Sequence, residues 1–386
     1  MATSQCDQFS YYFSSDSELK DFIDMNPECN TIPKLEIAGP DITNLALLSH
    51  FDTIGSLTIS HNSTISNLDF LETIEVSRGI SLQSLDNLES LSKFEEVQTQ
   101  SLNIYNCPLL NAFELTGEYY NNISLQSPNL EATVKHDISI GHLTLSQNVS
   151  FNSLAEVKVS QLKLHNATKY KSFTAITNNF RIDTLTTLQI WGAQDTFNSE
   201  GFPDSMVCRS FEIAGFNNLN ISGFESKTAF FRSFNLHSIS DLKDLVPFDK
   251  MHTEDRVSIQ NCDSISSLDG IPISEYIDAI SISNNLMLTD IQDIMKVNDT
   301  YGLSLIDNPL LATCNNRLVC DLIEAPNSAT RVKKILNFDY PTASGWSIRQ
   351  NFSNLKVGIR IFFVIRRFYA KTSFYDSDAS IGEFKY

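Results

Sequence analysis

The tripeptides Val257-Ser-Ile259, Ile280-Ser-Ile282 and Leu303-Ser-Leu305 follow one another at intervals of 23 residues, and this repetition decides the fold. Two apolar residues flank a polar one in each tripeptide. This alternation predicts a short β-strand with one buried face, because successive side chains of a strand point to opposite sides. The same motif occurs thirteen times, and its first residues are Leu35, Leu57, Ile80, Leu102, Ile123, Leu143, Leu162, Leu188, Phe211, Phe234, Val257, Ile280 and Leu303.

A repeat of about 23 residues is too short to bury its own apolar face, so successive coils must stack on one another. Further apolar residues after each strand, such as Leu68, Leu71 and Ile74, would fill the other sides of a coil. We predict an all-β, right-handed parallel β-solenoid in which strands start within two residues of most of these positions. A leucine-rich-repeat horseshoe is the helical alternative, but Ser, Thr and Asn occupy the segments where its helices would run.

An Asn commonly follows the strand motif, and we expect it to be buried at a turn. Its side-chain amide can satisfy backbone groups there and stack on the equivalent Asn of the next coil. Cys107 and Cys262 directly follow such an Asn, and we expect them to be buried as small apolar residues. The Asn residues concerned are Asn62, Asn106, Asn148, Asn166, Asn217, Asn261, Asn285 and Asn308.

The two ends of a solenoid expose apolar surface and need caps. At the N-terminal end, Ser15-Asp-Ser-Glu18 has the capping-box pattern that begins a helix, and Pro27 ends it. Cys6 and Cys29 bracket this helix, which predicts a disulfide between them.

At the C-terminal end, Cys314 and Cys320 flank a short turn, and we predict a second bridge between them. A second capping helix follows the turn and ends at Pro326. With seven cysteines, at least one thiol stays free in a monomer.

Several segments resemble known repeat proteins. Cys29-Asn-Thr-Ile32 followed by Leu35-Glu-Ile37 is similar to the start of receptor L domains, as in the insulin and epidermal growth factor receptors. Residues 41–45 and 54–62 resemble more closely a family of secreted or surface repeat proteins of flavobacteria and their relatives, and residues 307–314 followed by 319–321 resemble that family's terminal cap. The resemblance covers residues 6–326 and implies a receptor L-domain-like solenoid of about 13 coils.

Two regions depart from this pattern. The repeat steps of 19 and then 26 residues make residues 167–208 irregular, and this stretch is either a looped-out coil or a junction between two L-domain units. Residues 327–386 form a C-terminal extension of unknown role.

Charge and hydropathy narrow the function classes. The net charge of −18 argues against nucleic-acid partners, which need a positive surface. The most apolar run, residues 357–365, is far shorter than the roughly 20 residues of a membrane-spanning helix. No signal peptide is visible, but the paired cysteines favour export. We therefore expect a secreted or cell-surface protein whose leader is not part of this sequence.

Motifs for catalysis or metal binding are missing from the sequence. It has no HExxH, GxSxG, Walker A or GxGxxG pattern, so we predict no catalytic residues, metal or cofactor. A solenoid enzyme acting on polysaccharides remains the catalytic alternative, but it would need clustered carboxylates, and the acidic residues here are scattered. His61 and His165 directly precede repeat Asn residues, which predicts a role in the turns.

The polar residues inside the strand motifs define a possible binding face. In a stacked solenoid they would align in a row: Thr58, Ser81, Asn103, Ser124, Thr144, Lys163, Gln189, Glu212, Asn235, Ser258, Ser281 and Ser304. This row is either an ordinary solvated face or a docking surface centred on Asn103, Gln189 and Asn235. Trp191 follows the strand Leu188-Gln-Ile190, where an exposed indole could stack on a sugar ring, although a core position is favoured.

The sequence thus predicts an extracytoplasmic, non-catalytic binding, adhesion or surface-structural protein with a glycan or protein ligand. A eukaryotic receptor-like or cell-wall ectodomain of the same fold is the first alternative, and the polysaccharide-active enzyme is the second.

Overall fold

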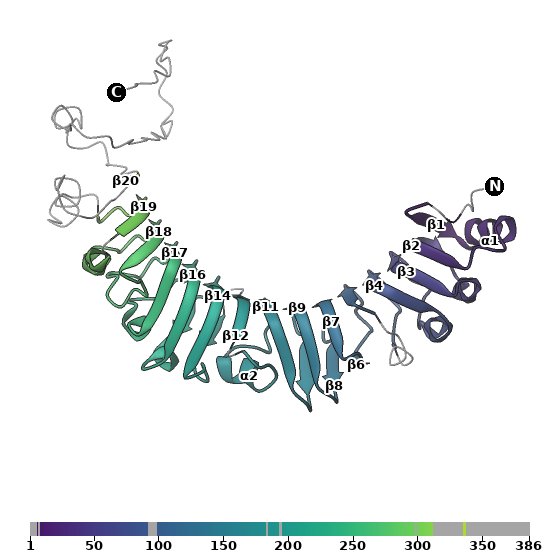
Figure 1. Ribbon diagram of the computed structural model, residues 1–386, viewed down its shortest axis with the longest axis horizontal. Coiled ribbons are helices and arrows are strands. Elements are labelled where there is room, and N and C mark those ends of the chain that lie inside the picture. The colour runs from purple at the N-terminus through teal and green to yellow at the C-terminus, as the bar shows by residue number, and fades with distance from the viewer. Residues whose placement is uncertain are drawn as a thin grey trace, which may run out of the picture. The chain divides into compact units, whose positions relative to one another are not determined.

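A computed structural model describes residues 6, 8–91, 99–182, 184–192, 195–297, 299–311 and 335–336. The chain forms two compact units, Met1–Asn235 and Leu236–Tyr386, and the boundary falls within β16 (Thr228–His237). Both units consist mainly of parallel strands that stack coil on coil (Figure 1). The predicted all-β parallel solenoid is therefore confirmed.

The long strands of unit 1 lie side by side in the order β1-β2-β3-β4-β5-β7-β9-β11-β12-β14-β16. They are β1 (Tyr11–Ser15), β2 (Thr31–Asp41), β3 (Thr53–Ser60), β4 (Glu75–Gln83), β5 (Ser101–Tyr105), β7 (Tyr119–Gln126), β9 (Ile138–Ser146), β11 (Val157–His165), β12 (Thr184–Trp191), β14 (Ser205–Ala214) and β16.

Shorter elements form the other sides of the coils in unit 1. Strands β6 (Ala112–Leu115), β8 (Glu131–Val134) and β10 (Ser150–Ser153) make a three-stranded sheet, and β13 (Thr196–Asn198) pairs with β15 (Asn218–Asn220). In other coils, short helical turns take the place of these short strands. Some helix therefore does form in the segments between the long strands, which are rich in Ser, Thr and Asn. These are η2 (Leu45–His50), η3 (Asp69–Thr73), α2 (Phe173–Thr177) and η5 (Ser222–Phe224).

Unit 2 repeats the arrangement in the strand order β17-β18-β19-β20. Its elements are η6 (Val246–Phe248), β17 (Met251–Gln260), β18 (Tyr276–Ser283), η7 (Gln292–Lys296), β19 (Asp299–Ile306) and β20 (Ile335–Leu336). The bridge predicted between Cys314 and Cys320, the second capping helix and almost all of the C-terminal extension lie outside the described residues.

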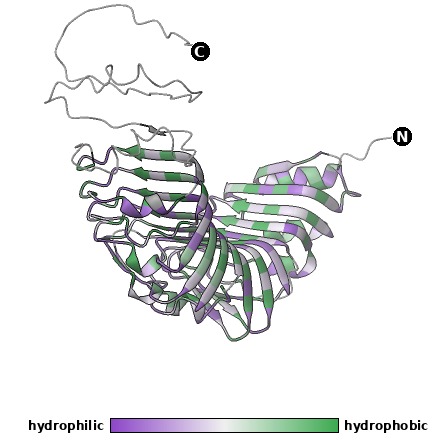
Figure 2. Ribbon diagram, turned by 60° about the vertical axis from the view of Figure 1, so that its left-hand side comes forward, coloured by the Kyte–Doolittle hydropathy of each residue, from purple (hydrophilic) through white to green (hydrophobic). Residues whose placement is uncertain are grey.

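The register of the long strands follows the sequence motif. The first residues of successive motifs pair directly with one another from Leu35 on β2 to Phe211 on β14, and again from Val257 to Leu303 in unit 2. The irregular stretch 167–208 does not interrupt this pairing, because Leu162 pairs with Leu188 and the extra residues hold α2. The alternation of apolar and polar residues along the strands can be followed in Figure 2.

The predicted strand starts were wrong. Of the described strands that carry the motif, only β5 begins within two residues of it, and the others begin four to six residues earlier. In β3, for example, Ile54 is buried three residues before Leu57, so the inward alternation slips by one residue within the strand. A strict period of two does not extend across such a slip, and the tripeptide motif therefore captured only the second half of the strands other than β5.

A sharp turn after the long strands holds most of the predicted Asn residues at one of two positions. Asn106, Asn166 and Asn261 occupy the first position, with φ between 51° and 53°, a conformation that Asn tolerates better than most residues. Their side chains point to solvent. The prediction of burial was therefore wrong for Asn106, Asn148, Asn166, Asn217 and Asn261, all of which are exposed.

The second position of the turn is buried, as predicted for Asn62, Asn285, Asn308, Cys107 and Cys262. In unit 2, Asn285 Oδ1 accepts a hydrogen bond from the backbone N–H of Cys262 at 2.9 Å, and Asn308 Oδ1 accepts one from that of Asn285 at 3.0 Å. Each side-chain amide thus accepts a hydrogen bond from a backbone N–H of the preceding coil. This is the ladder of Asn residues that the sequence predicts, and it lies one residue further along the turn than Asn106, Asn166 and Asn261.

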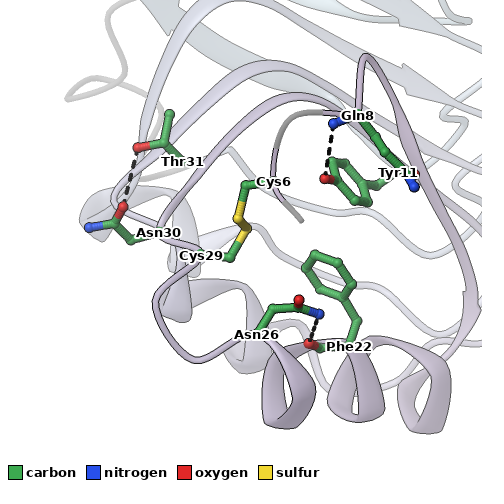
Figure 3. The surroundings of a disulfide bond; sticks show 8 residues. All are labelled: Cys6, Gln8, Tyr11, Phe22, Asn26, Cys29, Asn30 and Thr31. Carbon is green, nitrogen blue, oxygen red and sulfur yellow. Dashed lines mark hydrogen bonds between the residues drawn. A yellow bond between two sulfur atoms is a disulfide. The ribbon is translucent and has the colours of Figure 1, made fainter. Parts of the chain in front are cut away.

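The N-terminal helix α1 (Asp16–Met25) has the predicted boundaries. Ser15 is its N-cap and accepts from the Glu18 N–H at 3.3 Å, while Glu18 Oε2 accepts from the Ser14 N–H at 2.8 Å. The predicted disulfide between Cys6 and Cys29 is present, with a Cα–Cα distance of 5.8 Å. Figure 3 shows it beside Tyr11 and Phe22, whose ring centroids are 5.0 Å apart.

Candidate binding surface

The polar residues of the strand motifs share one side of the long strands, which we call the outer face. In unit 1 the row from Thr58 to Glu212 pairs residue by residue across β3 to β14, as the stacking predicts. Each of its side chains is half-buried, because the strands on either side stand about 4.8 Å away. In unit 2, Ser281 and Ser304 are also half-buried, but Ser258 is buried and does not belong to an accessible surface.

Hydrogen bonds hold the amide groups of the outer face in unit 1. Asn122 Nδ2 donates to Asn103 Oδ1 at 2.9 Å, and Gln189 Nε2 donates to Glu212 Oε2 at 2.8 Å. Asn235 Nδ2 donates to Ser233 Oγ at 3.2 Å. All three predicted face residues are therefore held by neighbours on the same surface. Binding a ligand would then cost less side-chain conformational entropy.

Trp191 ends β12 on the outer face and is 38% exposed, so the core position favoured by the sequence was wrong. Leu188 and Ile190 point inward, and strand alternation therefore turns the indole outward. The indole stacks on the imidazole of His165, with ring centroids 4.9 Å apart and an interplanar angle of 22°. The two residues pair directly between β11 and β12.

His165 was not recognised as part of this surface. It is the last residue of β11, and the positive φ of the turn belongs to Asn166, so the predicted turn role holds for His61 but not for His165. Burial, and after it the positive charge of Lys163, lower the pKa of His165. This shift favours the uncharged imidazole at neutral pH. Aligning the motifs at Leu162 and Leu188, which are 26 residues apart, places residue 165 beside residue 191. This alignment was the sequence signal that could have revealed the stack.

A hollow of about 420 Å³ lies beside α2 in unit 1 and includes Glu156 and Arg181 in its lining. Arg181 Nη1 donates to Glu156 Oε1 at 2.9 Å, and Lys158 Nζ lies 3.5 Å from Oε2. The hydrogen bond from Arg181 is the first cause that lowers the pKa of Glu156. This carboxylate is held as an anion, whereas a glycosidase acid needs a raised pKa.

The described part of the chain contains no group of three or more His, Cys, Asp or Glu side chains placed to hold a metal ion. Among the same residues, no helix is long and apolar enough to cross a membrane. Comparisons of the chain with protein-family models, curated proteins and solved structures returned no match.

Proposed function

We propose that this protein is an extracytoplasmic, non-catalytic binding or adhesion protein and that the outer face of unit 1 binds a glycan. The observation that carries the proposal is the exposed stack of Trp191 on His165 beside the in-register row Lys163, Gln189 and Glu212. Flat aromatic rings accept the C–H face of a sugar, while positioned amides and carboxylates bond its hydroxyl groups.

The regular spacing of the outer face suits an extended ligand. Parallel strands repeat the same polar position about every 4.8 Å, so a polymer lying across them meets equivalent groups along its length. The disulfide between Cys6 and Cys29 and the resemblance to receptor L domains favour a location outside the cytoplasm, as a secreted or cell-surface protein. A protein ligand on the same face is the alternative that the binding test distinguishes.

We expect Trp191→Ala to weaken glycan binding about tenfold, which corresponds to about 1.4 kcal/mol, because the substitution removes the aromatic platform. The measurement is calorimetric titration with a panel of soluble neutral and acidic polysaccharides. Tyr276→Ala serves as the matched control, since this aromatic residue is 66% exposed on β18 in unit 2. Equal loss in both variants, or binding of no glycan by the unmodified protein, would contradict the proposal.

A further inference from the structure

Two identical tripeptides lie one repeat apart in unit 1, Arg209-Ser-Phe211 on β14 and Arg232-Ser-Phe234 on β16. The two strands are neighbours in the sheet and have the same burial pattern through their first nine residues. The rings of Phe211 and Phe234 stack with centroids 5.6 Å apart and an interplanar angle of 9°. Arg209 and Arg232 therefore occupy the same position on adjacent strands.

Both guanidinium groups are exposed, and within the described residues neither makes an ion pair or hydrogen bond. Several other cations of unit 1 do have acidic partners, as Arg181 has Glu156 and Lys171 has Asp195. Like charges on adjacent strands repel each other, and the chain has 46 acidic residues that could have compensated them. An adjacent pair of guanidinium groups is well suited to bind one anionic group between them.

An apolar pair adjoins the two arginines. Val207 and Phe230 are 57% and 54% exposed and lie two residues before Arg209 and Arg232. Cys208 and Phe231, which separate them, point into the core, so the apolar and cationic side chains project from the same side of the strands. An apolar surface next to a paired cation matches a sugar ring that carries a carboxylate.

We propose that Arg209, Arg232, Val207 and Phe230 form a subsite for a uronic acid residue of an acidic glycan, with the carboxylate between the two guanidinium groups. The inference rests on the proposed function in taking the ligand to be a glycan, and it adds the class of glycan. The overall charge of −18 does not oppose such local recognition, because salt screens charges more than about 8–10 Å away.

The test compares polygalacturonate with its methyl ester, which has the same backbone without the charge. We expect the unmodified protein to bind polygalacturonate at least about tenfold more tightly, and the preference to fall as salt rises. The double variant Arg209→Gln/Arg232→Gln should lose this preference while binding the methyl ester as before. Arg78→Gln is the matched control and should keep the preference, since Arg78 is exposed at the equivalent position of β4 without an arginine beside it.

Equal affinity for the two polymers, failure to bind polygalacturonate, or a double variant that behaves like Arg78→Gln would overturn the subsite. Equally tight binding of poly-L-glutamate would overturn its specificity for a glycan. These results leave the proposed function standing if a neutral glycan binds in a Trp191-dependent way. If Trp191→Ala binds both polymers more weakly but still prefers polygalacturonate to its methyl ester, both proposals are supported.

Discussion

Phe173→Ala is expected to lower the free energy of unfolding by about 3–5 kcal/mol, the usual cost of removing a buried Phe from a packed core. Phe173 begins α2 and is fully buried. Its ring meets those of Phe197, Phe202 and Phe224 edge-on, with centroids 5.2, 4.9 and 5.7 Å away. The cluster joins three coils, so the cavity left by the substitution cannot close by the movement of one side chain.

Chemical denaturation of the full chain measures this effect. Phe173→Leu keeps most of the volume and should cost less than about 1.5 kcal/mol. Phe9→Ala, at a residue that is 80% exposed, should change stability by no more than about 0.5 kcal/mol. A Phe173→Ala variant as stable as Phe9→Ala would show that the aromatic cluster does not hold these coils together.

Loss of the disulfide between Cys6 and Cys29 is expected to lower the free energy of unfolding by about 3 kcal/mol. The bridge closes a loop with a sequence separation of 23 residues, and it stabilises chiefly by restricting the unfolded chain. It also ties the segment before β1 to the turn after α1. The measurement is the unfolding of Cys29→Ser compared with that of the unmodified protein, without reductant.

A reductant supplies the control for this prediction. In a Cys314→Ser/Cys320→Ser background, which removes the second predicted bridge, it should destabilise the protein by the same amount and leave the added Cys29→Ser variant unchanged, because Cys107, Cys208 and Cys262 are buried and free. If Cys6 and Cys29 were both found as free thiols in protein isolated without reductant, the argument for export would fail with the bridge.

Local patterns in the sequence predicted the register well. The pairing of Leu57 with Ile80, and of Ile280 with Leu303, follows from strand alternation combined with a constant repeat length. The same reasoning missed the first half of strands such as β3, because the slip between Ile54 and Leu57 breaks the period of two. It also placed Asn106 one residue too deep, since backbone conformation and not side-chain polarity assigns Asn to the first position of that turn.

The candidate surface was only partly predictable for a related reason. Asn103, Gln189 and Asn235 could be placed because each lies inside its own motif. The contact of His165 with Trp191 joins two coils across the longest repeat step, and it emerges only when the pairing of β11 with β12 is known. The pair of cations Arg209 and Arg232 can likewise be recognised only when β14 and β16 are known to be neighbouring strands.

The most direct test of the outer face as a binding surface is the triple variant Asn103→Lys/Gln189→Lys/Asn235→Lys, titrated with the neutral polysaccharide that the unmodified protein binds most tightly, so that the added positive charge does not itself attract the ligand. The control Asn67→Lys/Asn178→Lys/Asn218→Lys adds the same charge at exposed residues outside the outer face. We expect both variants to fold, the control to bind as before, and the outer-face variant to lose at least about tenfold in affinity, because long charged side chains replace the amides that face the ligand. Unchanged binding by a folded outer-face variant would contradict the account and place the ligand elsewhere on the solenoid.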